Sequence, residues 1–264
     1  MSADQGLKTT ASAKERTPTY DSPPHQLPRA DHRATAGLTM SRTPLLAMLH
    51  TVPGLVTDME HLAWNLVPRL RVLHFVDESL LQDTIAEGTA PGHVRRRLVA
   101  YARYAEESGA HALLVSCSSV GEAATAAQDF VSIPVLRIDT PMADLAVASG
   151  HRIGVLATLS ATLGPTTRLV QDSAKKQNKK PHITAVKAEG AFDALRAGNR
   201  ELHDSLVLDS FAELAADCDV VVLAQASMAR AIEHIRDRPG GPVVLASPDS
   251  GMTQLSALFG RQDQ

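Results

Sequence analysis

The chain has 264 residues, of which 44% are hydrophobic and 21% are charged, as is ordinary for a globular protein of one large or two modest domains. The formal net charge of −3 and the aromatic content of 3% argue against basic patches and base-stacking surfaces, so we expect no nucleic-acid partner. No apolar run reaches the roughly 18 residues of a membrane-spanning helix, so we expect no membrane partner either.

The first part of the chain differs in composition from the rest. Residues 1–43 are rich in Thr, Ser, Pro and Ala, and they lack any apolar periodicity. A segment that cannot bury an apolar face gains too little to offset the entropy lost on ordering. We therefore predict a disordered tail over residues 1–43.

From residue 44 onward, short apolar runs alternate with stretches of helical spacing. Unbroken apolar strands between helices are typical of parallel sheets that are covered on both faces. The predicted strands are Leu45–His50, Leu70–Val76, Ala112–Cys117, Pro134–Asp139, Arg152–Thr158, His182–Lys187, Asp219–Gln225 and Pro242–Ser247. The clearest helical patterns are Val94–Ser108, Met142–Ser149, Thr162–Gln177 and Arg200–Ala216.

The two sets of four strands look like copies of one unit. Leu45–Leu55 aligns with Ile153–Leu163, and Gln225 follows Cys117 by the same offset, 108 residues (225 − 117). The sequence thus predicts an α/β fold with two similar, pseudo-duplicated Rossmann-like domains, each built on a four-stranded parallel sheet, with the site in the cleft between them.

The predicted domains span residues 44–148 and 149–248. A C-terminal helix from about Ser250 falls in the segment 249–264, and packing back on the first domain is one arrangement open to it.

Cys117 is the residue that points most directly to chemistry. It follows a buried strand and precedes Ser118, Ser119 and a small-residue helix start, where backbone N–H groups favour an anion and therefore the thiolate. The alternative is a buried cysteine that acts as a small hydrophobe. Ser118 and Ser119 would bind substrate on the first interpretation and cap the helix on the second.

The other cysteine, Cys218, begins its strand and so lies at the opposite edge of its sheet. A disulfide with Cys117 is therefore not expected, and two separate thiols fit a reducing, cytoplasmic location.

Several cofactor and metal motifs are absent from the chain. It contains no GxGxxG after a strand and no GxxxxGK[ST], and its eleven His residues do not cluster at zinc spacing. We expect no cofactor and no metal site.

The strand ends carry a resemblance to a known family. The chain resembles the aspartate/glutamate/hydantoin racemase superfamily, which also includes arylmalonate decarboxylase and maleate isomerase. The resemblance is carried by Val115–Gly121 (VSCSSVG) and Val221–Met228 (VVLAQASM), and it is supported by Pro134–Asp139 and Arg152–Thr158. The resemblance implies cofactor-independent proton transfer at a carbon next to a carboxylate by two cysteines, one in each half. It also implies a homodimer or larger homo-oligomer as a candidate assembly.

Cys117 matches the first of the two family cysteines, but Gln225 occupies the place of the second. An amide cannot transfer a proton usefully, so the chain supports a one-thiol reaction. His50, at the end of the first strand, is a candidate second acid/base because imidazole titrates near neutral pH, although a His at this position is more often a local hydrogen-bonding group. The remaining candidate substrate-binding residues are Thr51, Thr158, Gln225 and Ser227, and Gln225 has a structural alternative as an amide that satisfies loop backbone.

Three functions remain open from the sequence. The leading one is a racemase or isomerase acting on a small carboxylate such as an amino acid or hydantoin. The alternatives are a decarboxylase of a malonate-like acid and a non-catalytic small-molecule-binding protein. The low aromatic content favours a pocket for a small polar acid over one for a bulky aryl group.

Overall fold

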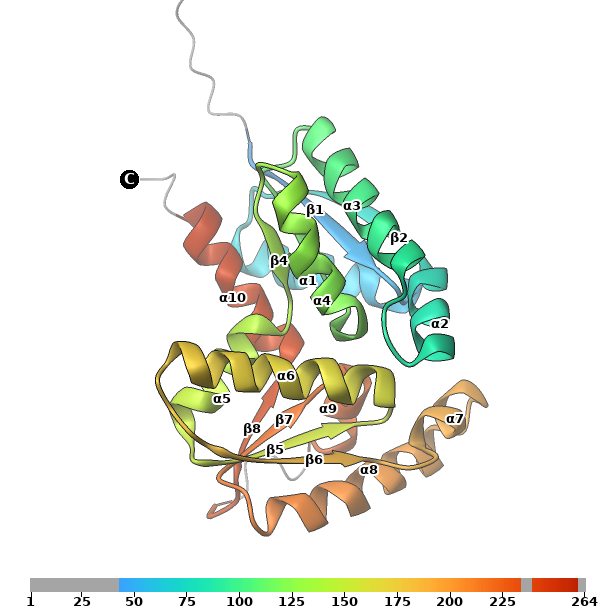
Figure 1. Ribbon diagram of the computed structural model, residues 1–264, viewed down its shortest axis with the longest axis vertical. Helices are drawn as coiled ribbons and strands as arrows, with labels where there is room; N and C mark the ends of the chain where they lie inside the picture. The colour runs from blue at the N-terminus through green and yellow to red at the C-terminus, as the bar shows by residue number, and fades with distance from the viewer. Residues whose placement is uncertain (1–42, 234–238, 261–264) are drawn as a thin grey trace, which may run out of the picture. The chain divides into compact units, whose positions relative to one another are not determined.

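The structure, a computed structural model, describes residues 43–233 and 239–260. The predicted tail therefore lies almost wholly outside the described residues. The described chain forms two α/β halves, each centred on one sheet (Figure 1). The predicted fold class, with two similar domains, is confirmed.

Both sheets have four strands, and every pairing is parallel. The first sheet has the order β2 (Arg71–Val76), β1 (Leu45–His50), β3 (Ala112–Val115), β4 (Val135–Arg137). The second has the order β6 (His182–Lys187), β5 (Arg152–Ala157), β7 (Val220–Leu223), β8 (Val243–Ala246). The strand order of the second sheet thus repeats that of the first, as the aligned segments predict.

The helices connect the strands and cover the sheets. The first half of the sequence supplies α1 (Val56–Leu66), α2 (Glu78–Glu87), α3 (Gly92–Glu107), α4 (Gly121–Ala127) and α5 (Thr140–Ser149). The remainder supplies α6 (Ser160–Lys176), α7 (Ala191–Arg196), α8 (Arg200–Ala215), α9 (Ser227–Ala231) and α10 (Ser247–Phe259). Three short 3-10 turns occur at Pro53–Leu55 (η1), Ser118–Val120 (η2) and Gln128–Phe130 (η3). No helix in the described residues is long and apolar enough to cross a membrane.

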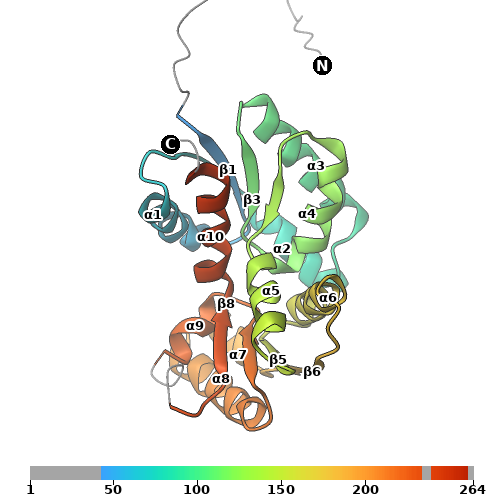
Figure 2. The same cartoon turned by 90° about the vertical axis from the view of Figure 1, so that its left-hand side faces the viewer.

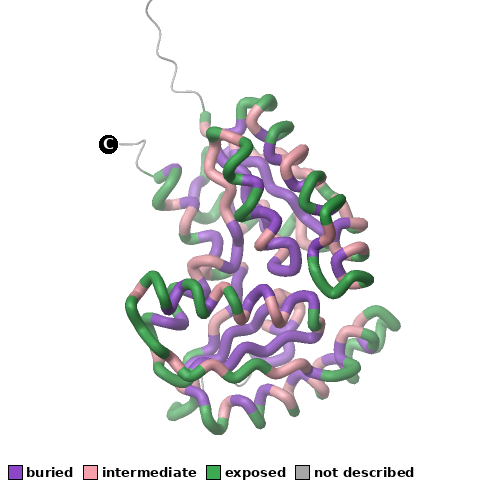
Figure 3. The backbone as a smooth tube through the Cα atoms, viewed as in Figure 1, coloured by how far each residue is buried: buried purple, intermediate pink, exposed green. Residues whose placement is uncertain are grey.

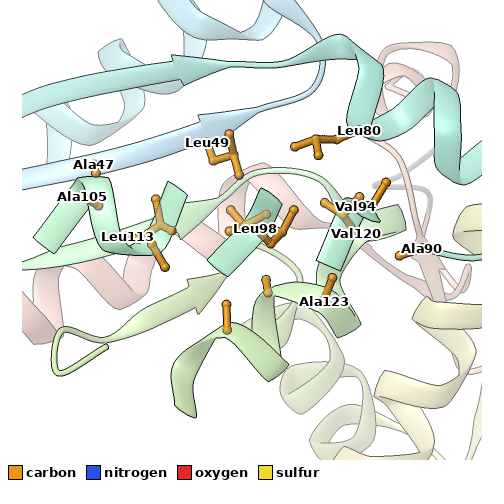
Figure 4. Packing of buried hydrophobic residues seen from close by; sticks show 14 of the residues in the cluster. Ala47, Leu49, Leu80, Ala90, Val94, Leu98, Ala105, Leu113, Val120 and Ala123 are labelled. Carbon is orange, nitrogen blue, oxygen red and sulfur yellow. The ribbon is translucent and has the colours of Figure 1, made fainter. Parts of the chain in front are cut away.

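The first sheet is buried on both faces because successive side chains of β1 alternate between them. Ala47 and Leu49 face α2, α3 and α4, where they pack with Leu80 and Leu98 (Figure 4). Leu46 and Met48 face the opposite way and pack against α1 and α10. The central strands β1, β3, β5 and β7 run through the interior, whereas the edge strands β2 and β6 are more exposed (Figure 3). This two-sided burial explains why the strand sequences read as unbroken apolar runs.

Two helices pack on the sheet of the other half. Met142 and Ala146 of α5 lie against β5 and β7 of the second sheet, although α5 directly follows the first sheet in sequence. Met252 and Leu255 of α10 lie against the first sheet, beside α1 (Figure 2). A Cβ at Gly251 would lie 2.0 Å from the Ile138 carbonyl oxygen, so α10 can approach the chain after β4 this closely only with glycine there.

Candidate active site

A cavity of about 510 Å³ lies where the carboxyl ends of the two sheets meet. It is lined by segments that follow β1, β3, β5, β7 and β8, together with side chains of α1, α2 and α7. Open α/β folds build their sites at this edge, because loops from several strands converge there. The volume suits a small organic molecule.

Cys117 lies two residues beyond β3 and lines this cavity. Its backbone is extended, with φ −121° and ψ 115°, and the chain then turns into η2 and α4. Its side chain is partly exposed, whereas Cys218 is buried beside Leu214 and Phe211 in the core of the second half. Of the two thiols, Cys117 is therefore the one that a solute can reach.

Neutral hydrogen-bonding groups line the same cavity as the thiol. Thr51, Ser118 and Ser227 line the cavity, and within residues 43–233 and 239–260 none of their hydroxyl groups bonds to another protein group. Thr51 and Ser118 are also buried, with 3% and 6% of their surface exposed. Because both residues line the cavity and their hydroxyl groups bond to no other protein group in the described part of the chain, these groups are available to a ligand.

Gln225 faces the cavity from the end of β7, the strand equivalent to β3. Its Oε1 accepts hydrogen bonds from the Thr158 backbone N–H at 2.7 Å and from Thr158 Oγ1 at 3.1 Å. This contact fixes the amide, so its Nε2 donor remains for a ligand. Thr158 itself does not line the main cavity; it borders a smaller one of about 210 Å³.

Ser119 lines the cavity but is engaged with the second half. Its hydroxyl lies 2.7 Å from Thr162 Oγ1 of α6, in a buried contact. Nearby, Arg168 Nη2 of α6 donates to Glu122 Oε2 of α4 at 3.1 Å, and this ion pair holds the pKa of the Glu122 carboxyl below its ordinary value. Ser119 therefore joins the two walls of the cavity.

His50 is not among the residues that line the cavity. Its imidazole is completely buried: Nδ1 lies 3.0 Å from Ser116 Oγ, and Nε2 lies 3.0 Å from His74 Nδ1. Burial, reinforced by His74, lowers the pKa of His50 from 6.5 to about 4. His50 is predicted to act on the substrate directly as an acid or base, but the structure does not place it in the cavity. Ser116 lies between His50 and the cavity.

The walls away from the thiol are apolar. They comprise the side chains of Val52, Leu55, Met59, Leu62, Leu81, Leu159, Phe192, Leu195 and Pro248. Among the lining residues the charged ones are Asp58 and Arg230, both exposed, and Arg230 pairs with Asp204 at 2.9 Å. The low aromatic content predicts a pocket for a small polar acid, but the cavity walls are largely apolar. Aliphatic side chains supply this apolar surface, so the aromatic content of the chain does not report on it. Within the described residues, no group of three His, Cys, Asp or Glu side chains could hold a metal.

Sequence reasoning missed Ser116 and Thr162 as site residues. Ser116 immediately precedes Cys117, so its place at the end of β3 was a usable signal. Thr162 lies inside α6, and nothing in its local sequence pattern distinguishes it from other positions of that helix.

Two like-ordered parallel sheets that share one cavity, with a thiol at the end of a central strand, define a duplicated α/β protein with a small-molecule site. Residues 57–254 match the family model described as Asp/Glu/Hydantoin racemase. The chain belongs to this family, and the resemblance seen in the sequence is confirmed.

Solved structures show the same fold. Glutamate racemase isoform RacE1 from Bacillus anthracis is 16% identical over 83% of each chain, with a TM-score of 0.65. Aspartate racemase from Picrophilus torridus is 13% identical over 82% of this chain and 94% of the other, with a TM-score of 0.62. A mutant of arylmalonate decarboxylase is 16% identical over 84% and 95%, with a TM-score of 0.55. A search of curated protein sequences finds no match.

Proposed function

We propose that the protein is a cofactor-independent racemase or isomerase that acts through Cys117 at a carbon next to a carboxylate or related carbonyl. The observation that carries the proposal is the reachable thiol set among unpartnered neutral donors at the meeting point of the two sheets. A thiolate can remove the proton at such a carbon, and donors aimed at the carboxylate stabilise the enediolate as its charge develops.

The donors divide between the two walls. Thr51 and Ser118 contribute hydroxyl groups from the first half, and Ser227 and the Gln225 amide contribute from the second. These neutral groups suit a single carboxylate. An amino acid with two carboxylates and an ammonium group would find no cation for its second carboxylate among the buried lining residues, because Arg230 is exposed and already paired with Asp204.

The apolar walls define the rest of the substrate. Leu55, Leu62 and Leu81 come from the first half, and Phe192 and Leu195 come from the second. Burial of an apolar group contributes about 25 cal/mol for each Å² removed from water, so these side chains favour a hydrophobic substituent. We infer a small monocarboxylic acid, or a neutral cyclic amide such as a hydantoin, with an apolar group on the reacting carbon.

One observation favours a second candidate function. Gln225 replaces the second thiol, and a decarboxylation followed by protonation needs only one thiol. The fold is shared with arylmalonate decarboxylase, so a malonate-like acid with an apolar substituent is the alternative substrate. A homodimer or larger assembly and a cytoplasmic location stay predictions from the sequence.

The test is an incubation of the full chain in deuterated water with 2-phenylpropanoate, phenylmalonate, a 5-substituted hydantoin and aspartate. Deuterium at the reacting carbon without loss of carbon supports the isomerase, and carbon dioxide from phenylmalonate supports the decarboxylase. The Cys117→Ser variant should lose at least a hundredfold in rate, whereas Cys218→Ser, the matched control far from the cavity, should retain it. Full activity in Cys117→Ser would refute the proposed mechanism. Ligand-induced thermal stabilisation without any reaction would instead indicate a binding protein.

A further inference from the structure

A chain of polar side chains leads from the cavity toward the surface of the first half. Ser116 lines the cavity, and its Oγ lies 3.0 Å from His50 Nδ1. His50 Nε2 lies 3.0 Å from His74 Nδ1, and the two ring centroids are 5.2 Å apart. His74 Nε2 faces Glu60 Oε1 at 3.7 Å.

The two ends of this chain are in different environments. At the inner end, Ser116 is partly exposed to the cavity beside Cys117. At the outer end, the side chains of His74 and Glu60 are 18% and 28% exposed. Between them, His50 is completely buried. This series of polar side chains therefore connects the cavity with the surface through the buried imidazole of His50.

A purely structural role explains these contacts poorly. His74 Nε2 is buried without a hydrogen-bond partner among the described residues. An unsatisfied buried nitrogen costs about 1 to 3 kcal/mol, so a stabilising role alone does not account for His74.

The pair has the property that proton transfer requires. His50 stays neutral near pH 7 because burial lowers the pKa of its imidazole to about 4. A neutral imidazole has one N–H group and one lone pair, so it can accept a proton at one nitrogen while it releases one at the other. Both links from His50 are already at hydrogen-bond length, and Ser116 Oγ is also held by donation to the Leu49 carbonyl oxygen at 3.2 Å.

We propose that Ser116 is the second proton-transfer group of the site and that His50 and His74 connect it to the surface beside Glu60. This inference rests on the proposed function, in which Cys117 removes a proton from the substrate and Gln225 cannot return one. Ser116 is then a catalytic residue, and His50 and His74 are relay residues that act through it.

The transfer balances in protons and charge. The Ser116 O–H bond breaks as a new C–H bond forms on the substrate carbanion, and Ser116 Oγ takes the Nδ1 proton of His50. His50 Nε2 takes the Nδ1 proton of His74, and His74 Nε2, which is itself buried, takes a proton by way of the Glu60 carboxyl group, which is exposed to water. The proton that Cys117 removed leaves its thiol for solvent. One proton enters for each that leaves, and no charge remains in the wall.

The test compares Ser116→Ala and His50→Gln with the wild-type chain, using whichever acid exchanges deuterium with the wild-type protein. Glutamine can keep the hydrogen bonds of His50 but cannot pass a proton along. We expect both variants to lose about a hundredfold in exchange rate, while alkylation of Cys117 and thermal stabilisation by the acid stay unchanged. The matched control is His182→Gln, at an exposed position of β6 away from the chain of residues, which should exchange at the wild-type rate.

A second readout separates a relay from a structural role. The exchange rate in mixtures of light and heavy water should curve with deuterium content in the wild-type protein, because several protons move together, and the residual rate in Ser116→Ala should not. Wild-type exchange rates in both variants, or equal losses of exchange, alkylation and ligand stabilisation, would overturn the relay alone. Absence of exchange with every acid in the wild-type protein would overturn the proposed function and the relay with it.

Discussion

The buried His50 imidazole predicts how the stability of the protein depends on pH. Its pKa is about 4 in the folded state and 6.5 in the absence of burial. Between these values the unfolded chain binds a proton that the folded chain does not, so the free energy of unfolding rises with pH across this window. The contribution of neutral His50 is complete above about pH 6.5 and is lost as the pH falls toward 4.

The magnitude follows from the shift. One pKa unit corresponds to about 1.4 kcal/mol, so the full contribution is about 3 kcal/mol and the part lost between pH 7 and pH 5 is about 2 kcal/mol. The groups that face His50 are His74 from β2 and Ser116 after β3, with Glu60 of α1 beyond His74. None of them places an anion against His50 that could hold a charged imidazole.

The perturbation is His50→Gln, and the assay is urea unfolding of both proteins at several pH values from 7 to 5. The wild-type protein should lose about 2 kcal/mol more over this range than the variant, whatever their difference at pH 7. Carboxyl groups with lowered pKa, such as Asp219 at about 2, act mainly below this range and equally in both proteins. Parallel curves for the two proteins would refute the reasoning, and His182→Gln controls for the new glutamine.

Two further changes test the packing that holds the cavity together. Gly251→Ala should lower the free energy of unfolding by about 3 kcal/mol in a urea titration, because the new Cβ would lie 2.0 Å from the Ile138 carbonyl oxygen. The control Gly260→Ala should have little effect, because nothing lies within 4 Å of its Cβ. Equal stabilities of the two variants would contradict this account. Asp139→Asn should lower thermal stability by the equivalent of about 3 to 5 kcal/mol. The change leaves the Arg137 guanidinium buried without the carboxylate that accepts its hydrogen bonds at 2.9 Å. An unchanged melting temperature would show that Arg137 finds another partner.

The central strands could be predicted because burial on both faces produces an unbroken apolar run in the sequence. A strand such as Leu45–His50 is covered on both faces, so nearly every position must be apolar. The packing of α5 and α10 on the opposite sheets could not be predicted. Helical periodicity shows that a face is buried, but it carries no information on which sheet covers that face. The predicted domain boundary between residues 148 and 149 follows the sequence repeat. It assigns α5 to the first domain, although α5 packs on the second sheet.

The site could be predicted only as far as strand ends determine it. Cys117, Ser118 and Gln225 follow central strands, and the fold brings such positions to one cavity whatever their side chains do. The direction of a side chain is a finer property, since successive residues of a strand point to opposite faces. His50 follows this rule by pointing behind the cavity while its neighbour Thr51 lines it.

The duplication has left the two halves with different parts of the chemistry. At the end of β3 stands a reachable thiol, backed by Ser116 and the His50 imidazole. At the equivalent end of β7, the Gln225 amide is fixed by Thr158 and offers only a hydrogen-bond donor. The thiol and the hydroxyl group backed by an imidazole therefore belong to the first half, whereas the Ser227 hydroxyl of the second half has no imidazole of the described residues behind it. In the proposed mechanism the first wall supplies both proton-transfer groups, so a route from that wall to solvent matters more here than in a site with two thiols.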